Sequence, residues 1–194
     1  YPIGDLLVDA NKRIYGTFSI GTSGVSGWIF SVDTAGGSFV DRGYLDGSTG
    51  LQLVTELVLA PNGKLYGAAN EGGTYGKGTV FSLDSAASGQ LCAALHSFND
   101  TSGNSSRGGV MLGSDGALYG VATKGGDFSL TAGFGGGVLY RLDTTGANFT
   151  VLHVFNSATG YSPWGTLLET EVILGLEEPS VAQEVSVYPV PSKD

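Results

Sequence analysis

The chain has 194 residues, 33 of them glycine, and its 18 acidic and 9 basic residues give a formal net charge of −9. Hydrophobic residues make up 41% of the sequence, which excludes a largely disordered chain, and the glycines follow no three-residue period, which excludes collagen. The acidic balance argues against a nucleic-acid partner, no apolar run approaches the roughly 18 residues that span a bilayer, and a single cysteine cannot form an internal disulfide.

One sequence pattern occurs three times along the chain. It opens with an apolar run, a tight turn and a Tyr-Gly pair, which occupy residues 6–16, 57–67 and 110–120. The second copy begins 51 residues after the first, and the third begins 53 residues after the second. A near-constant period of this length indicates a repeat architecture, in which each copy is one supersecondary unit.

Each copy predicts four short β-strands. The first two strands flank a turn such as Asn62-Gly63, a pair that accepts the positive φ of a hairpin. The third strand alternates in polarity and stops at an aspartate, in residues 27–33, 78–84 and 137–143. The fourth strand closes the copy, at residues 44–45, 95–98 and 152–155. No segment has a helical period, so the sequence predicts an all-β fold.

Four strands in about 50 residues are typical of a β-propeller blade. We expect repeats of four-stranded antiparallel sheets, with blades at residues 1–50, 51–105 and 106–168, the last range including the start of a fourth copy. A β-solenoid is the alternative architecture. Three blades are fewer than the four to eight that close a ring, so we expect a fragment, or part of a larger ring.

The best-formed copy resembles a known tandem repeat. Its pattern runs from Leu65-Tyr66-Gly67 through a glycine-rich stretch at 72–78 and a strand at 79–84 to Leu95-His96-Ser97-Phe98. This pattern resembles the GloVer repeat of bacterial choice-of-anchor surface proteins, and the resemblance covers residues 1–168. It implies an exported, surface-anchored protein with no assigned catalytic role.

The residues that follow the third copy, which we call the tail, do not continue the repeat pattern. Residues 165–174 are expected to add an edge or closing strand, residues 169–184 form an acidic linker, and residues 185–194 begin a further domain. Val187-Tyr188-Pro189-Val190-Pro191 is similar to the opening of the C-terminal sorting domain of the type IX secretion system in Bacteroidota, with Val190 where asparagine is usual. This second resemblance also implies a location outside the cell.

Residues that recur in the repeat are expected to have structural roles. His96 and His153 share one repeat position, and Cys92 is expected to be a buried residue of a strand at 91–95. We therefore predict no catalytic, cofactor-binding or metal-binding residue. The loop at 100–104 has some character of a calcium loop, but lacks the spacing and terminal glutamate of an EF-hand.

Two sets of candidate site residues remain. The motif Asp-Ser/Thr-small recurs after the third strand and resembles the O-glycosylation acceptor of exported Bacteroidota proteins, although a plain turn is the alternative. Its candidate acceptors are Thr34, Ser85 and Thr144. Aromatic residues outside the repeat pattern are candidates for ligand contact, because insertions in repeat proteins map to a binding face. These residues are Tyr75, Phe128, Phe134 and Trp164.

These observations favour a secreted or cell-surface, non-catalytic protein for adhesion or binding, with a glycan or protein ligand and no cofactor. One alternative is a structural protein that self-associates through exposed blade edges, because unpaired strands template further pairing. A carbohydrate-active enzyme is the third hypothesis.

Overall fold

The computed structural model describes residues 4–19, 27–53, 55–129 and 133–170, and these contain β-strands and no helix. No helix able to cross a membrane therefore occurs in this part of the chain. The first copy contains β1 (Leu7–Val8), β2 (Arg13–Phe18), β3 (Trp28–Asp33) and β4 (Val40–Tyr44). The second contains β5 (Val58–Leu59), β6 (Lys64–Ala69), β7 (Thr79–Asp84), β8 (Gln90–Leu91) and β9 (Ala93–Ser97). The third contains β10 (Val110–Leu112), β11 (Ala117–Ala122), β12 (Val138–Asp143) and β13 (Thr150–Val154).

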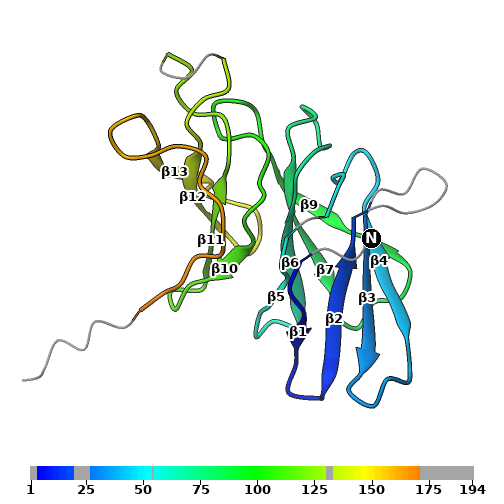
Figure 1. Ribbon diagram of the computed structural model, residues 1–194. Coiled ribbons are helices and arrows are strands. Elements are labelled where there is room, and N and C mark those ends of the chain that lie inside the picture. The colour runs from blue at the N-terminus through cyan, green and yellow to red at the C-terminus, as the bar shows by residue number, and fades with distance from the viewer. Residues whose placement is uncertain (1–3, 20–26, 54, 130–132, 171–194) are drawn as a thin grey trace, which may run out of the picture.

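The strands form three separate sheets, one for each copy (Figure 1). We call β1–β4 blade 1, the sheet β5-β6-β7-β9 blade 2, and the sheet β10-β11-β12-β13 blade 3. Neighbouring strands within each blade are antiparallel and follow chain order, apart from the position of β8. The predicted all-β fold of repeated four-stranded sheets is confirmed, and the order of strands is that of propeller blades rather than of solenoid coils.

The glycine of each Tyr-Gly pair allows an aromatic ring to cross the sheet. Gly67 of β6 is paired with Phe81 of β7, and a Cβ on Gly67 would lie 2.6 Å from Cζ of that ring. Gly16 has the same relation to Phe30, again at 2.6 Å. In blade 3 the ring of Tyr140 crosses Gly120. A side chain at these positions would displace the ring, so the repeat needs glycine there.

The tyrosine of the same pair anchors the first hairpin. The Nδ2 atom of Asn62 donates to the Tyr66 hydroxyl at 2.8 Å, so the side chain of the turn is tied to the second strand. Tyr119 donates to Asp115 at 2.9 Å in the corresponding hairpin. Blade 1 makes the same kind of contact with a different residue, because Tyr15 donates to Asp9 at 3.2 Å.

The chain leaves each blade through a repeated polar turn. In blade 2 the backbone N–H of Asn99 donates to Oγ of Ser102 at 3.0 Å, and the N–H of Ser102 donates back to the Asn99 side chain at 2.9 Å. The same reciprocal pair joins Asp46 to Thr49 and Asn156 to Thr159. We call these three segments the exit turns.

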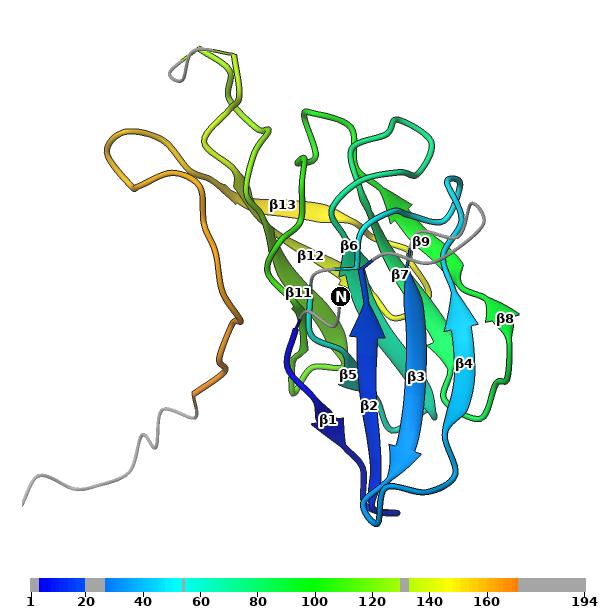
Figure 2. The same cartoon turned by 45° about the vertical axis from the view of Figure 1, so that its right-hand side comes forward.

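The fourth strand of the second copy differs from the expectation. The predicted strand at 91–95 is interrupted at Cys92, and the two residues before it form β8. β8 pairs in parallel with β4 of blade 1, with Gly43 opposite Gln90 (Figure 2). The sheet of blade 1 therefore has a fifth strand at its outer edge, and this strand comes from the next copy. The additional backbone hydrogen bonds tie blades 1 and 2 together.

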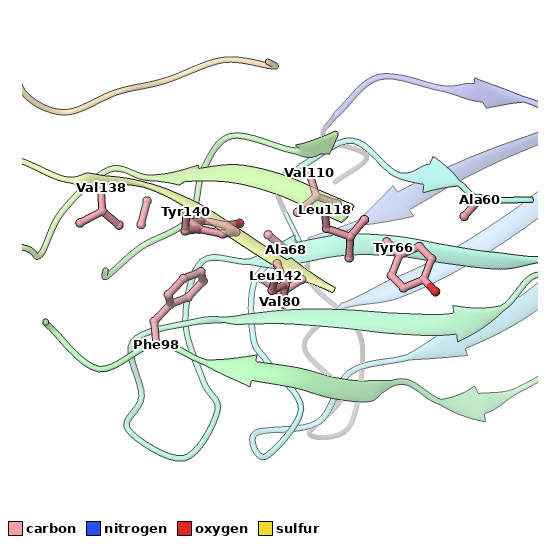
Figure 3. Close-up of a cluster of buried hydrophobic side chains, with 11 residues drawn as sticks. Ala60, Tyr66, Ala68, Val80, Phe98, Val110, Leu118, Val138, Tyr140 and Leu142 are labelled. Atoms are coloured by element: carbon pink, nitrogen blue, oxygen red, sulfur yellow. The ribbon is translucent and has the colours of Figure 1, made fainter. Parts of the chain in front are cut away.

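A hydrophobic core lies between each pair of neighbouring blades. The first lies between blades 1 and 2 and includes Ile29, Leu45, Leu65, Phe81 and Leu83. The second lies between blades 2 and 3 (Figure 3). Its fully buried members with the largest side chains are Tyr66, Tyr140, Phe98, Leu118 and Leu142. Each inner sheet face is thus buried against the neighbouring copy, so burial of apolar area stabilises the stack of blades and not only the single blade.

The chain continues past blade 3 without a further strand in its described part. Residues 165–170 form no ladder, so the expected strand over 165–174 is wrong for those positions. They are held by side chains instead: the N–H and Oγ of Ser114 both donate to the Glu169 carboxylate at 2.7 Å. Residues 171–174, most of the predicted acidic linker and the predicted start of a sorting domain lie outside the described residues.

Candidate functional site

The two ends of the blades differ in the length of their connections. At one end lie the tight turns at 9–12, 60–63 and 113–116, and we call this the turn end. The opposite end carries the longer connections at 70–78, 98–105 and 123–137 (its described part), and we call it the loop end (Figure 1). Binding residues are commonly placed on such loops above a rigid scaffold, so we describe the loop end first.

Two adjoining open clefts lie at the loop end. The first has a volume of 430 Å³ and is lined by Tyr75, Lys77, Asn99, Asp100 and Thr101. The second, of 570 Å³, is lined by Thr101, Gly126, Asp127, Val151, Val154 and Asn156. Because Thr101 borders both, the clefts adjoin each other where the exit turn of blade 2 meets the loop of blade 3.

The polar groups of the first cleft are held in fixed orientations. Lys77 Nζ lies 3.2 Å from Oδ1 of Asp100, and Asn104 donates to the same oxygen at 2.9 Å. The backbone carbonyl of Asp100 also accepts from the N–H of Gly126 at 2.8 Å, which links the exit turn to blade 3. The ion pair is partly exposed and adds little to stability, but together these contacts position an ammonium and a carboxylate beside the Tyr75 ring.

Aromatic side chains border these clefts from exposed positions. Tyr75 is 58% exposed, and Phe134 is 62% exposed with the Lys124 ammonium 5.2 Å from its ring centre. Phe128 follows Asp127, which lines the second cleft, and is 39% exposed. Tyr75 lines the first cleft, and Phe128 and Phe134 lie in the loop of blade 3 that supplies Asp127 to the second cleft. Large exposed rings of this kind, in and beside open clefts, are typical of a ligand surface.

Trp164, the fourth sequence candidate, lies apart from the other three. It is 68% exposed and packs against the guanidinium of Arg107, 5.5 Å from the ring centre. The next residues return towards blade 2, where Thr166 donates to the Glu56 carboxylate. The structure therefore brings Tyr75 into one of the clefts, places Phe128 and Phe134 in the adjoining loop of blade 3, and leaves Trp164 out of this group.

The candidate glycosylation residues lie at the turn end. Thr34 is exposed and follows Asp33, whose Oδ1 accepts from the N–H groups of Ala35 and Gly37 at 2.9 Å. Ser85 and Thr144 occupy the same place in the other copies and are half-buried. These bonds show the aspartate-held turn that the sequence indicated at this position.

The two histidines make one repeated contact. Nε2 of His96 lies 3.2 Å from Oγ of Ser102, and Nε2 of His153 lies 3.2 Å from Oγ1 of Thr159. His96 also stacks on Phe149 of blade 3, with ring centres 3.6 Å apart. Burial lowers the pKa of His96 to about 4, so its ring is neutral at pH 7 and holds the exit turn.

Cys92 lies in the core between blades 1 and 2. It is 2% exposed, and burial raises the pKa of its thiol to about 12. A thiol that stays protonated is neither a nucleophile nor a metal ligand at neutral pH. The expectation that this residue is a small buried hydrophobe is confirmed, although it lies between two strands and not inside one.

The loop at 100–104 does not gather acidic ligands. The described residues contain no group of three or more His, Cys, Asp or Glu side chains placed to hold a metal ion. In this loop the one carboxylate, on Asp100, is already bound by an ammonium and an amide.

Sequence reasoning missed three polar residues of the clefts. Lys77, Asn99 and Asn156 were not singled out, although Asn99 and Asn156 begin the exit turns. The signal for the exit turns was present, as an Asx residue three positions before Ser or Thr in each copy at 46–49, 99–102 and 156–159. Recognising a cleft also required knowing which loops of neighbouring copies meet.

Three blades with shared inner contacts define a tandem-repeat protein built of propeller-like sheets. The family model of the Gloeobacter/Verrucomicrobia repeat matches residues 1–178. The chain therefore belongs to this repeat family. The repeated sequence pattern indicates a tandem-repeat protein, and that part of the resemblance is confirmed. No curated protein matches the chain.

Proposed function

We propose that the chain is a non-catalytic binding protein of the cell surface, and that it binds a glycan at the loop end between blades 2 and 3. The observation that carries the proposal is the pair of adjoining clefts, the first of which combines the exposed Tyr75 ring with amide, carboxylate and ammonium groups. Rings stack on the apolar faces of sugars, and planar polar side chains bond their hydroxyl groups. Both kinds of group line the first cleft, in Tyr75 and Asn99.

The state of the carboxylates supports binding over hydrolysis. Glycoside hydrolysis needs a carboxylic acid with a raised pKa to protonate the leaving group. Hydrogen bonds from Ser129 instead hold the pKa of Asp127 below its usual value. Asp100, the other carboxylate of the clefts, is engaged by Lys77 and Asn104. Neither carboxyl group is placed to act as a general acid.

A glycan array followed by product analysis tests this proposal. The chain should bind at least one glycan, and Tyr75→Ala should weaken that binding about fivefold to tenfold, because stacking on one ring is worth about 1 kcal/mol. Tyr161→Ala is the control, since Tyr161 is 63% exposed but lies outside the described lining of both clefts. The bound glycan should be recovered intact. A cleaved glycan, or equal effects of the two substitutions, would contradict the proposal.

Export through a type IX system is part of the same proposal. Its support is the sequence of the tail, which is similar to the opening of a sorting domain, together with the repeat resemblance to surface proteins. O-glycosylation fits this route, and Thr34 is the best of the three candidates because it is exposed, whereas Ser85 and Thr144 are half-buried. Sugars at the turn end would leave the loop-end clefts open.

Intact mass measures this modification. Protein from the native host should exceed 19.8 kDa, with sugar mapped to Thr34 first and to Ser85 or Thr144 second. Peptides that show all three residues unmodified would reject glycosylation, and would leave the binding proposal to its own test.

A further inference from the structure

The free face of blade 1, the face turned away from blade 2, carries a stack of aromatic rings. Phe18 and Phe30 have ring centres 4.8 Å apart, and Phe30 and Phe39 have ring centres 5.6 Å apart. Phe39 is 63% exposed and Leu6 is 62% exposed. A cluster of this kind is rare on the surface of a monomer and marks an interaction surface.

The other two copies show what covers these positions. Phe30 corresponds to Phe81 and to Tyr140, and both of those rings are fully buried against the preceding blade. Phe39 corresponds in register to Phe149, which stacks on His96 of blade 2. The free face of blade 1 therefore has the composition of a blade-to-blade joint.

Blade 3 presents the complementary half of such a joint. In blade 2 three residues reach the next blade: His96 stacks on Phe149, Phe98 meets Tyr140 edge-on at 5.2 Å, and the Tyr66 hydroxyl donates to the Thr144 carbonyl at 3.3 Å. The same positions of blade 3 are occupied by His153, Phe155 and Tyr119. His153 is exposed, and the neighbouring Leu152 is 48% exposed.

Two polar atoms on blade 1 also lack a partner. The indole Nε1 of Trp28 and Oδ1 of Asp41 are buried without a hydrogen bond within the part of the chain that is described. At the joint between blades 1 and 2, the residue that corresponds to Trp28 is Thr79, and its hydroxyl donates to the carbonyl of Thr49 in the exit turn at 2.7 Å. Thr79 shows that this repeat position can contact the exit turn of the preceding blade, and the third copy has Val138 there.

We propose that the free face of blade 1 binds the free face of blade 3 of a second copy of this chain, head to tail. In this joint Phe39 of one copy stacks on His153 of the other, Phe30 meets Phe155, and Trp28 faces the exit turn that begins at Asn156. The three described blades of each of two copies, joined by two such contacts, make six blades, within the range of four to eight that closes a propeller. The contact uses sheet faces and not strand edges, since the outer edge of β4 is already paired with β8.

Docking has one steric requirement. Residues 166–168 match residues 5–7 in sequence, which lead into β1 of blade 1. They therefore stand where the first strand of a following blade would begin, and a docked copy brings its own β1 to this place. The segment must therefore move aside. Its described contacts are exposed ones, from Ser114 to Glu169 and from Thr166 to Glu56, and its Leu168 is 83% exposed, so little packing opposes the movement.

Sedimentation velocity of the full chain up to about 0.1 mM tests the association. Wild-type protein should form a particle of twice the 19.8 kDa chain mass. Phe39→Asp should sediment as a monomer with an unchanged β-sheet spectrum, because this ring is exposed in the single chain. Tyr75→Asp is the matched control, since Tyr75 is 58% exposed at the loop end, and should remain a dimer. A monomeric wild type, or a dimer that survives Phe39→Asp, would overturn the proposal.

Disulfide trapping tests the orientation of the two copies. A mixture of Phe39→Cys and His153→Cys chains should give a covalent dimer under mild oxidation, whereas each variant alone should not, because identical positions do not meet in a head-to-tail joint. The buried Cys92 supplies no background thiol. Equal crosslinking of either variant alone would show a face-to-face dimer of another kind, and the absence of any crosslink from the mixture would refute the joint.

Discussion

The residue type at some positions of this repeat is determined by the side chain that crosses it from a neighbouring strand. The glycine of each Tyr-Gly pair lies under a ring of the next strand, in the pairs Gly16–Phe30 and Gly67–Phe81. The repetition of the pair in the sequence was visible without the structure, but its cause was not. A cross-strand contact depends on register, and the sequence does not state which residue will lie opposite the glycine.

Gly67→Ala should destabilise the protein by about 1–3 kcal/mol, because the new methyl group would overpack against the buried ring of Phe81. Urea denaturation measures this loss as a lower midpoint. Gly47→Ala is the control, since a Cβ at Gly47 would meet no atom within 4 Å. Equal midpoints for the two variants would show that the ring does not constrain the glycine.

His96 should make stability depend on pH. Its pKa is lowered from 6.5 to about 4 in the folded protein by burial, so between these values the unfolded chain binds more protons than the folded one. The free energy of unfolding should therefore rise with pH from about 4 to 6.5, and the contribution of His96 should be lost as the pH falls through this window.

Denaturation across that window compares the wild type with His96→Gln. The substitution should flatten the slope of stability against pH. His153→Gln, made on the free face of blade 3 and compared in the monomeric Phe39→Asp background, should change it less. An unchanged slope in His96→Gln would mean that acidic groups alone set the pH dependence.

At the scale of the element, the exit turns and the displaced strand β8 join the blades. The strands themselves were predictable, because alternation, hairpin turns and terminal aspartates recur in each copy. β8 was not predictable. In the second copy His96 comes 12 positions after Asp84, whereas in the third His153 comes 10 positions after Asp143. No local pattern says that the two extra residues pair with the preceding sheet.

The same insertion explains why blade 1 departs from the repeat. Gly43 stands at the position of His96, and a Cβ there would strike the carbonyl of Gln90 in β8 and lie 2.9 Å from the Leu83 side chain. The strand added by the second copy thus excludes a histidine from the first. In the sequence, Gly43 looks like a loss of the repeat pattern. In the structure it is the residue that leaves room for β8 beside β4.

Ser102→Ala should destabilise the protein more than Thr159→Ala. Both remove the hydroxyl of an exit turn, which costs about 1 kcal/mol. Ser102 also bonds the half-buried His96 at the joint between blades 2 and 3, whereas the partner of Thr159 is the exposed His153. Thermal denaturation of the two variants measures the difference, and a larger loss for Thr159→Ala would contradict this account of the joint.

At the scale of the whole molecule, the proposed binding site lies between two neighbouring copies of the repeat and not within one copy. The repeat number, the sheets and the loop positions followed from self-comparison of the sequence, which also named Tyr75, Phe128, Phe134 and Trp164 as candidates for ligand contact. The clefts could not be found in this way, because Thr101 of the second copy and Asp127 of the third meet only after the blades stack. The loop end and the turn end then separate the proposed glycan site from the proposed glycosylation sites.

Hydrogen–deuterium exchange with an array-selected glycan tests this division most directly. We predict that bound glycan protects amides at 73–78, 99–104 and 126–129, where the two clefts lie, and leaves the turns at 34–37, 60–63 and 113–116 unchanged. Protection confined to the turn end, or to the faces of blades 1 and 3, would contradict the claim that the loop end is the binding surface.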